Sequence, residues 1–217
     1  MERPSRYRTD YLVVLALVAL VGLINLDGMS LETHEAYVVV PARNMADPDV
    51  WLDALVWLDR EDFIDRDRWA QADDLTPPPN TPLNHWMVPV INGKPRLKKT
   101  PLPYWIGAGV FKLGLEVNDT TARLPAVATL IALALLTLWI GRRLLGRRVA
   151  LIGALMLTTS LVAGQFGRNA RVEIMITFWV TAAMVCWHRA IHARGGWGRV
   201  GWVLAAWAAM GIGNLAK

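Results

Sequence analysis

The 217-residue sequence lacks a second cysteine, so no disulfide can form within the chain. Its one cysteine, Cys186, lies inside an apolar run, and a catalytic thiol is therefore not expected. Ionisable residues are nearly absent from the apolar runs, which argues against a transporter or channel, because those proteins carry such residues within their spans. Residues 27–30, after the first run, lack an A-x-A-like cleavage site, so that run is expected to be an uncleaved helix.

Long apolar runs dominate what is present. Hydrophobic residues make up 54% of the chain, and a helix needs roughly 20 apolar residues to cross a bilayer. The runs cover residues 11–26, 123–140, 149–166, 174–191 and 200–216. The sequence therefore predicts an all-α, polytopic membrane protein with about five transmembrane helices.

Arginines gather in the segments that flank these runs, in three clusters: residues 3–8, 142–148 and 189–199. An excess of lysine and arginine marks the cytoplasmic side of a membrane protein. The N-terminus is therefore expected in the cytoplasm, and the chain in the cell's inner membrane. The net charge of +5 is interpreted as a determinant of topology and not as a nucleic-acid-binding surface.

Residues 27–122 are then expected to form one long loop on the outer face. Within it, residues 102–115 are shorter than a full span and are interrupted by Lys112, so they are expected to form a helix at the interface. Residues 47–83 are rich in aspartate and are interpreted as an acidic insert with a short amphipathic helix. Residues 84–105 gather lysines, prolines and tryptophans.

Charged residues of both signs are expected on the outer face. Carboxylates could act as a base towards an acceptor hydroxyl or amine, or could hold a divalent ion. Lysines and arginines could bind a phosphate leaving group. A polyprenyl-phosphate sugar matches this chemistry, because its tail lies in the bilayer, its phosphate at the interface and its sugar in water. The residues concerned are Glu32, His34, Glu35, Arg43, Lys98, Lys99, Arg171 and Glu173.

Glu173 opens an otherwise apolar run. Taken alone, it is better explained as a carboxylate that the helix dipole and Arg171 or Arg168 stabilise. An acid at this position is nonetheless costly unless it is paired or functional. Together with the other outer-face charges, it favours a site.

The order of several short motifs resembles the N-terminal part of the membrane-embedded type C glycosyltransferases. These include the aminoarabinose transferases that modify lipid A and the dolichyl-phosphate-mannose protein mannosyltransferases. The motifs are HEAY and ARNM after the first helix, then W-x-V-P, NGKPRLKKTPLPYW, ARLP and RNARVE. The resemblance implies an inverting transfer of a sugar from a polyprenyl-phosphate donor to a lipid, glycan or protein acceptor.

The resemblance also implies roles for residues. The family's Asp-Glu pair after the first helix falls on His34 and Glu35, so Glu35, or else Glu32, is the candidate acid and His34 is a departure. Glu173 would be the partner of Glu35. Lys99 and Arg171 would contact the donor phosphate, with Lys98 and Arg43 as further candidates. A divalent ion is an optional cofactor, and its ligands are unknown.

Members of this family are usually about twice this length or more, and they continue with further helices. The chain is therefore interpreted as an N-terminal portion that appears C-terminally truncated. The alternative is a non-catalytic membrane subunit or an inactive fragment, which the truncation and His34 favour.

Overall fold

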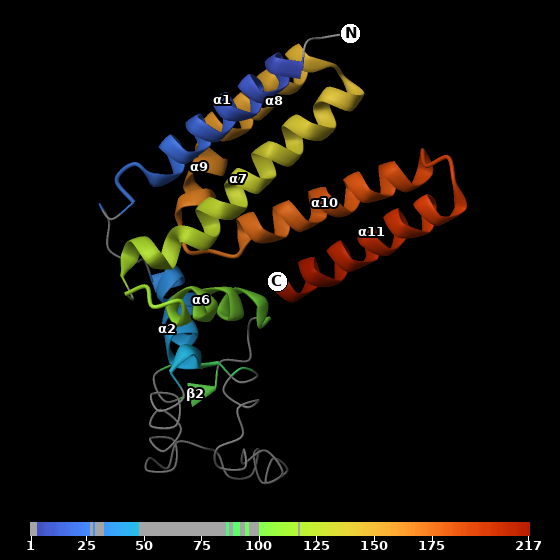
Figure 1. Ribbon diagram of the computed structural model, residues 1–217. Helices are drawn as coiled ribbons and strands as arrows, with labels where there is room; N and C mark the ends of the chain where they lie inside the picture. Colours follow the sequence, from blue (N-terminus) through green and yellow to red (C-terminus); the bar gives the residue numbers. More distant parts are fainter. Residues whose placement is uncertain are drawn as a thin grey trace. The chain divides into compact units, whose positions relative to one another are not determined.

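The structure, a computed structural model, describes residues 4–26, 28, 33–47, 86, 89–91, 94–95, 100–116 and 118–217 (Figure 1). The chain divides into two units, one of residues 1–30 with 123–217 and one of residues 31–122. Helices account for nearly all of the regular structure, so the predicted all-α class is confirmed. The exception is a short antiparallel pair, β1 (Val90–Ile91) with β2 (Lys94–Pro95).

The larger unit holds helices over all five predicted apolar runs. They are α1 (Pro4–Leu23), α7 (Asp119–Leu144), α8 (Arg147–Thr159), α9 (Leu161–Arg168), α10 (Glu173–Ile191) and α11 (Gly196–Ala216). Among the described residues, α7 and α10 are long and apolar enough to cross a bilayer, and the pair α8–α9 is a third candidate. Length and composition thus mark two or three spans, compared with the five expected.

One face of α1 shows how this unit packs. Its buried residues, Asp10, Val14, Val18 and Gly22, recur every four positions and are followed by Leu26 after the helix, and residues four apart share a helix face. The other faces of α1 are apolar yet exposed, as expected of a surface that meets lipid. A Cβ on Gly22 would lie 2.8 Å from a methyl carbon of Val127, so the missing side chain lets α1 approach α7 closely.

The third apolar run, predicted as one span, is divided into two helices. The axes of α8 and α9 differ by 60°. Ser160 between them has an extended backbone, and its hydroxyl accepts a hydrogen bond from the amide of Ala163. Such a serine satisfies the first turn of a new helix in place of continuing the old one. The run therefore bends at Ser160.

Gly167 near the end of α9 is a second point of close contact with α7. A Cβ added there would lie 2.5 Å from a methyl carbon of Leu130, whose side chain is completely buried. We expect Gly167→Ala to destabilise the fold by about 1–3 kcal/mol, the usual cost of overpacking. Thermal unfolding in detergent would measure this, with Gly164→Ala as the control because no atom lies near its Cβ position. Equal stability of the two variants would contradict this packing.

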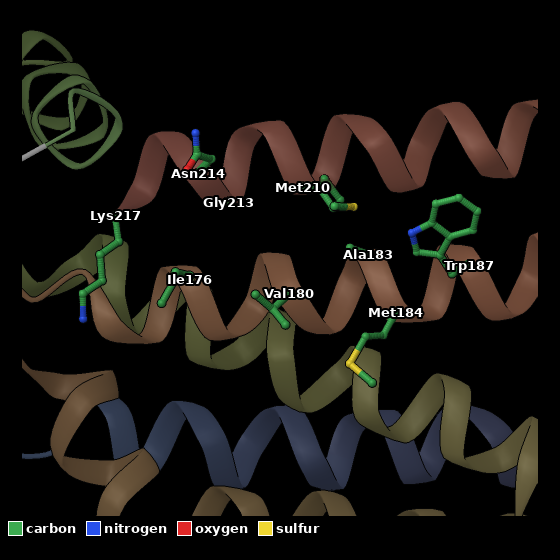
Figure 2. Close-up of a pocket in the computed structure, with 10 residues that line it drawn as sticks. Ile176, Val180, Ala183, Met184, Trp187, Met210, Gly213, Asn214 and Lys217 are labelled. Atoms are coloured by element: carbon green, nitrogen blue, oxygen red, sulfur yellow. The ribbon is translucent and has the colours of Figure 1, made fainter.

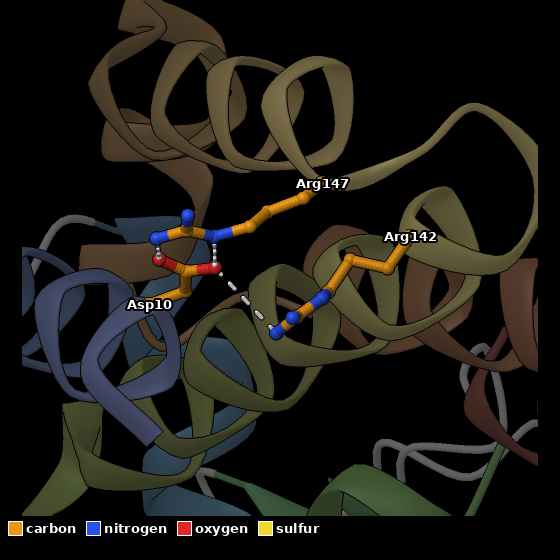
Figure 3. A network of polar contacts seen from close by, with 3 residues as sticks. All are labelled: Asp10, Arg142 and Arg147. Carbon is orange, nitrogen blue, oxygen red and sulfur yellow. Dashed lines mark hydrogen bonds and ion pairs between the residues drawn. The ribbon is translucent and has the colours of Figure 1, made fainter. Parts of the chain in front are cut away.

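A buried ion cluster joins α1, α7 and α8 (Figure 3). Nε and Nη2 of Arg147 donate to the two carboxylate oxygens of Asp10, each at 2.7 Å. Nη1 of Arg142 lies 3.6 Å from Asp10 Oδ2. The Asp10 side chain is only 3% exposed, so both cations stabilise a carboxylate that has lost most of its hydration.

The smaller unit is built on α2 (Thr33–Ala46) and α6 (Leu102–Lys112). A Cβ on Gly107 of α6 would lie 2.8 Å from the methyl of Ala42, so the missing side chain at Gly107 lets α6 approach α2 closely. Met45, Tyr104 and Ala108 form their buried core. The helix expected over residues 102–115 is therefore present, although it ends at Lys112 and packs against α2.

Candidate functional site

Glu35, the candidate acid of the sequence analysis, lies in the first turn of α2. Its side chain is completely buried. A carboxylate is costly to remove from water unless it is paired or hydrogen bonded, and Glu35 does have such an interaction in this structure. A buried carboxylate at the start of a helix is also in a place where the helix dipole favours negative charge. Glu35 is therefore held in a defined environment.

Arg43 lies on the same helix but is exposed. Eight residues separate it from Glu35, which corresponds to about 12 Å along a helix axis. The structure thus does not bring these two predicted residues together on α2. Neighbouring Asn44 is buried instead, and its Nδ2 donates to the carbonyl of Val90 at 2.9 Å, which anchors the strand pair to α2.

The strip of residues 84–105 is attached to α6 through tryptophans. Trp105 Nε1 donates to the carbonyl of Trp86 at 2.6 Å. The ammonium of Lys112 lies 4.9 Å from the centre of a Trp86 ring, within the range of a cation–π contact. Both ends of the strip are thereby held to one helix, and the candidate lysines lie in the chain between them.

Glu173, the second candidate acid, is the first residue of α10. Its carboxylate oxygen Oε1 lies 3.9 Å from Nζ of Lys217. Both side chains are partly exposed, at 36% and 49%, so the ion pair is open to solvent and contributes little to stability. Arg171 stands two residues earlier, with its guanidinium 5.9 Å from the centre of the Phe166 ring. The start of α10 thus has one carboxylate, that of Glu173, with the cation of Lys217 beside it and the cation of Arg171 two residues earlier in the chain.

An apolar groove of about 540 Å³ runs between α10 and α11 (Figure 2). Its walls are Ile176, Val180, Ala183, Met184, Trp187, Ala209, Met210, Gly213, Asn214 and Lys217. Its volume falls within the range of small-molecule sites, roughly 300–1,000 Å³. Lys217 lines one end, where it pairs with Glu173. The groove is therefore apolar along its length and charged at one end.

Several predicted residues lie outside the described part of the chain. These are Glu32, Lys98, Lys99, the side chain of His34 and the acidic insert apart from Asp47. Glu35 and Arg43 belong to the unit of residues 31–122, whereas Arg171 and Glu173 belong to the other unit. The roles of these residues remain predictions.

Lys217 was not among the predicted site residues. The sequence did contain a signal for it, because a lysine is unusual at the end of an apolar run.

Within the described ranges, no three His, Cys, Asp or Glu side chains gather closely enough to hold a metal ion.

Comparison with known proteins adds a family and a fold. The family model described as dolichyl-phosphate-mannose-protein mannosyltransferase matches residues 82–217. The undecaprenyl phosphate-alpha-4-amino-4-deoxy-L-arabinose arabinosyl transferase of Edwardsiella ictaluri is 31% identical over 136 residues, which is 61% of this chain and 24% of that protein. The second such transferase of Sodalis glossinidius is 26% identical over 133 residues, 61% of this chain and 24% of that protein.

Crystal structures of ArnT from Cupriavidus metallidurans share the fold. The apo structure gives a TM-score of 0.70 at 19% identity and covers 97% of this chain and 33% of that one. The structure bound to undecaprenyl phosphate gives a TM-score of 0.67 at 18% identity and covers 95% and 32%. The chain therefore spans about a quarter of the curated relatives and about a third of the solved neighbours.

Proposed function

Because the chain belongs to the dolichyl-phosphate-mannose-protein mannosyltransferase family, we propose that it forms part of a membrane glycosyltransferase that uses a polyprenyl-phosphate sugar. The donor named for the arabinosyl transferase relatives is of this kind, an undecaprenyl phosphate sugar. The acceptor is proposed to be a lipid, with glycans and proteins as alternatives that the assay distinguishes. The transferred sugar is proposed to be a pentose or a hexose.

The observation that carries this proposal is the groove between α10 and α11, which ends at Lys217, the ion-pair partner of Glu173. A polyprenyl phosphate has a long apolar chain and an anionic head. The apolar walls suit the chain, and the ammonium of Lys217 suits a phosphate oxygen. A phosphate at this end would lie beside the Glu173 carboxylate, in the place where an acceptor group could lose its proton.

Transfer requires two kinds of group. A base must take the proton of the acceptor hydroxyl or amine as it attacks the sugar, and cations must stabilise the departing phosphate. We assign the first role to Glu35 with Glu173 as its partner, and the second to Lys99 and Arg171. Lys98 and Arg43 are further phosphate candidates, and Glu32 and His34 are further candidates near the base.

The proposal includes an inner-membrane location with a cytoplasmic N-terminus, and these residues would then lie on the outer face. Residues 1–217 are proposed to form the N-terminal part of the enzyme's membrane domain.

A divalent ion is an optional part of the proposal, because carboxylate oxygens are preferred ligands of divalent cations. Sugar transfer is therefore measured with and without a chelator.

The test is sugar transfer by the purified full-length protein in liposomes that contain a polyprenyl-phosphate sugar. The proposal expects release of polyprenyl phosphate together with a labelled lipid acceptor. Lys99→Ala is expected to lower kcat/KM for the donor. Normal turnover in both Glu35→Gln and Lys99→Ala would overturn the site assignment.

A bulky residue in the groove is expected to weaken donor binding. Val180 lines the groove and is exposed, so Val180→Trp fills space without disturbing a buried contact. We expect KM for the polyprenyl donor to rise about tenfold or more, because the loss of a few buried methylenes costs about 1–3 kcal/mol. Leu204→Trp is the control, since Leu204 is exposed on α11 outside the groove. An equal KM in both variants would exclude the groove as the donor site.

A further inference from the structure

Two tryptophans hold two arginines near the end of α7, the end of α10 and the start of α11. The guanidinium carbon of Arg189 lies 5.2 Å from the centre of the Trp202 ring and 5.9 Å from that of the Trp139 ring. The guanidinium carbon of Arg143 lies 4.5 Å from the Trp139 ring centre. These distances are within the range of cation–π contacts. The four residues are named here the arginine–tryptophan cluster.

The cluster has three helices of one unit as its frame. Trp139 and Arg143 belong to α7, Arg189 to α10 and Trp202 to α11. The hairpin of α10 and α11 brings the start of α11 back beside the end of α10 (Figure 1). Trp139 is shared by both arginines, so the two positive charges are held near one another.

No carboxylate balances these two charges. Among the described residues of this unit, the carboxylates are Asp10 and Glu173. Asp10 already forms its bidentate contact with Arg147. Glu173 begins α10, sixteen residues before Arg189, which corresponds to about 24 Å along a helix axis. The cluster therefore keeps its positive charge.

One donor of the cluster is buried and unsatisfied. Nε of Arg189 is buried and has no hydrogen-bond partner within the described part of the chain. A buried donor without a partner is destabilising and requires an explanation, of which an ion is one. Aromatic rings cover the faces of a guanidinium and leave its N–H groups along the edge, which matches two oxygens of a phosphate. A phosphate would satisfy this donor and the charge together.

The helix ends that carry the cluster also carry apolar side chains in contact with solvent. These side chains are more than half exposed: Leu144, Leu145, Ile191 and Trp197. Both α7 and α10 are long and apolar enough to cross a bilayer, so their ends would lie at the membrane interface, where tryptophans gather and phospholipid headgroups are found. A ligand with an anionic head and apolar chains suits such a surface better than a free anion does.

We propose that the arginine–tryptophan cluster binds the phosphate of an anionic phospholipid. Arg143 and Arg189 contact the phosphate oxygens, and Trp139 and Trp202 hold the two guanidinium groups in place. The site belongs to the opposite end of α10 from Glu173, so it is separate from the charged end of the groove. The inference does not rest on the proposed function.

The experiment titrates phosphatidylglycerol into the delipidated full-length protein in detergent and counts bound lipid by native mass spectrometry. The first variant combines Arg143→Lys with Arg189→Lys, which keeps both charges and therefore the topology, but loses the planar guanidinium. We expect its apparent Kd for the lipid to rise several-fold. Arg143→Gln with Arg189→Gln removes both charges and is expected to raise Kd on the order of tenfold or more.

The control combines Arg8→Lys with Arg148→Lys, because both arginines are exposed and belong to α1 and α8. Its Kd is expected to equal that of the parent. Trp139→Leu leaves both arginines in the chain and removes the ring that they share, so it is expected to weaken lipid binding as the first variant does. Melting temperatures without lipid show that each variant is folded.

Two further ligands identify the source of the phosphate. Phosphatidylcholine has the same phosphate but no net charge, and it is expected to bind more weakly than phosphatidylglycerol. Inorganic phosphate lacks the apolar chains and is expected to displace the lipid only at much higher concentration. Displacement by an equal concentration of inorganic phosphate would overturn the assignment to a lipid.

Three other results would overturn the inference. The first is parent-like binding of phosphatidylglycerol by both double variants of the cluster. The second is an equal loss in the control, which would assign the binding to surface charge in general. The third is equal binding of phosphatidylcholine. Absence of sugar transfer would overturn the proposed function and leave these binding results unchanged, so the two proposals fail separately.

Discussion

Glu35→Gln is expected to lower the turnover number of the full-length enzyme by about 10²–10⁴-fold, the usual contribution of a general base. Glutamine has nearly the same shape as glutamate, so the buried packing at the start of α2 is kept. It cannot accept the proton of the acceptor, however, and the proton must then pass to water. KM for the donor is expected to change little, because the lost interaction is made in the transition state.

Asp47→Asn provides the matched control. Asp47 follows α2 directly and is exposed, so its neutralisation removes the same charge from the same unit at an exposed position. The rates are compared as release of polyprenyl phosphate in liposomes. Equal rates for Glu35→Gln and Asp47→Asn would remove Glu35 from the mechanism. The same comparison with Glu173→Gln shows whether the two carboxylates act as one unit, since paired groups give non-additive losses.

The helices were largely predictable from the sequence. An apolar run that is about long enough to cross a bilayer must satisfy its backbone hydrogen bonds internally, and a helix is the simplest structure that does so. The bend at Ser160 was not predictable. A serine inside an apolar run leaves the hydropathy almost unchanged, and the break depends on one hydrogen bond from Ala163 to the Ser160 hydroxyl. The strand pair at Val90–Pro95 was also missed, since two residues a strand give no periodic signal.

The candidate site was predictable in part. Glu173 begins α10, as the charge at the edge of an apolar run indicated. Its ion pair with Lys217 depends on the hairpin of α10 and α11, which brings the two ends together, and no local pattern records such a pairing. The hydrogen bonds that Arg123 and Arg168 donate to backbone carbonyls at the end of α1 could not be predicted for the same reason. Every residue has a backbone carbonyl, so no residue type in the sequence indicates which carbonyl an arginine will contact.

The second large effect is expected at the ion cluster of Asp10, Arg142 and Arg147. Asp10→Asn keeps the shape of the side chain but removes the negative charge that Arg147 of α8 and Arg142 of α7 both contact. Removing one partner of a buried ion pair typically costs about 3–5 kcal/mol. We expect a loss of stability of this size, measured as the free energy of unfolding in detergent and followed by tryptophan fluorescence.

A double-mutant cycle with Arg147→Gln isolates the interaction. If the bidentate contact of Asp10 with Arg147 carries the effect, the double variant will be more stable than the sum of the two single losses predicts. Arg148→Gln is the control, because its exposed side chain lies next in sequence and carries the same charge. A loss below about 1 kcal/mol for Asp10→Asn would place the cluster among ordinary surface ion pairs. The junction of α1, α7 and α8 would then depend on apolar packing alone.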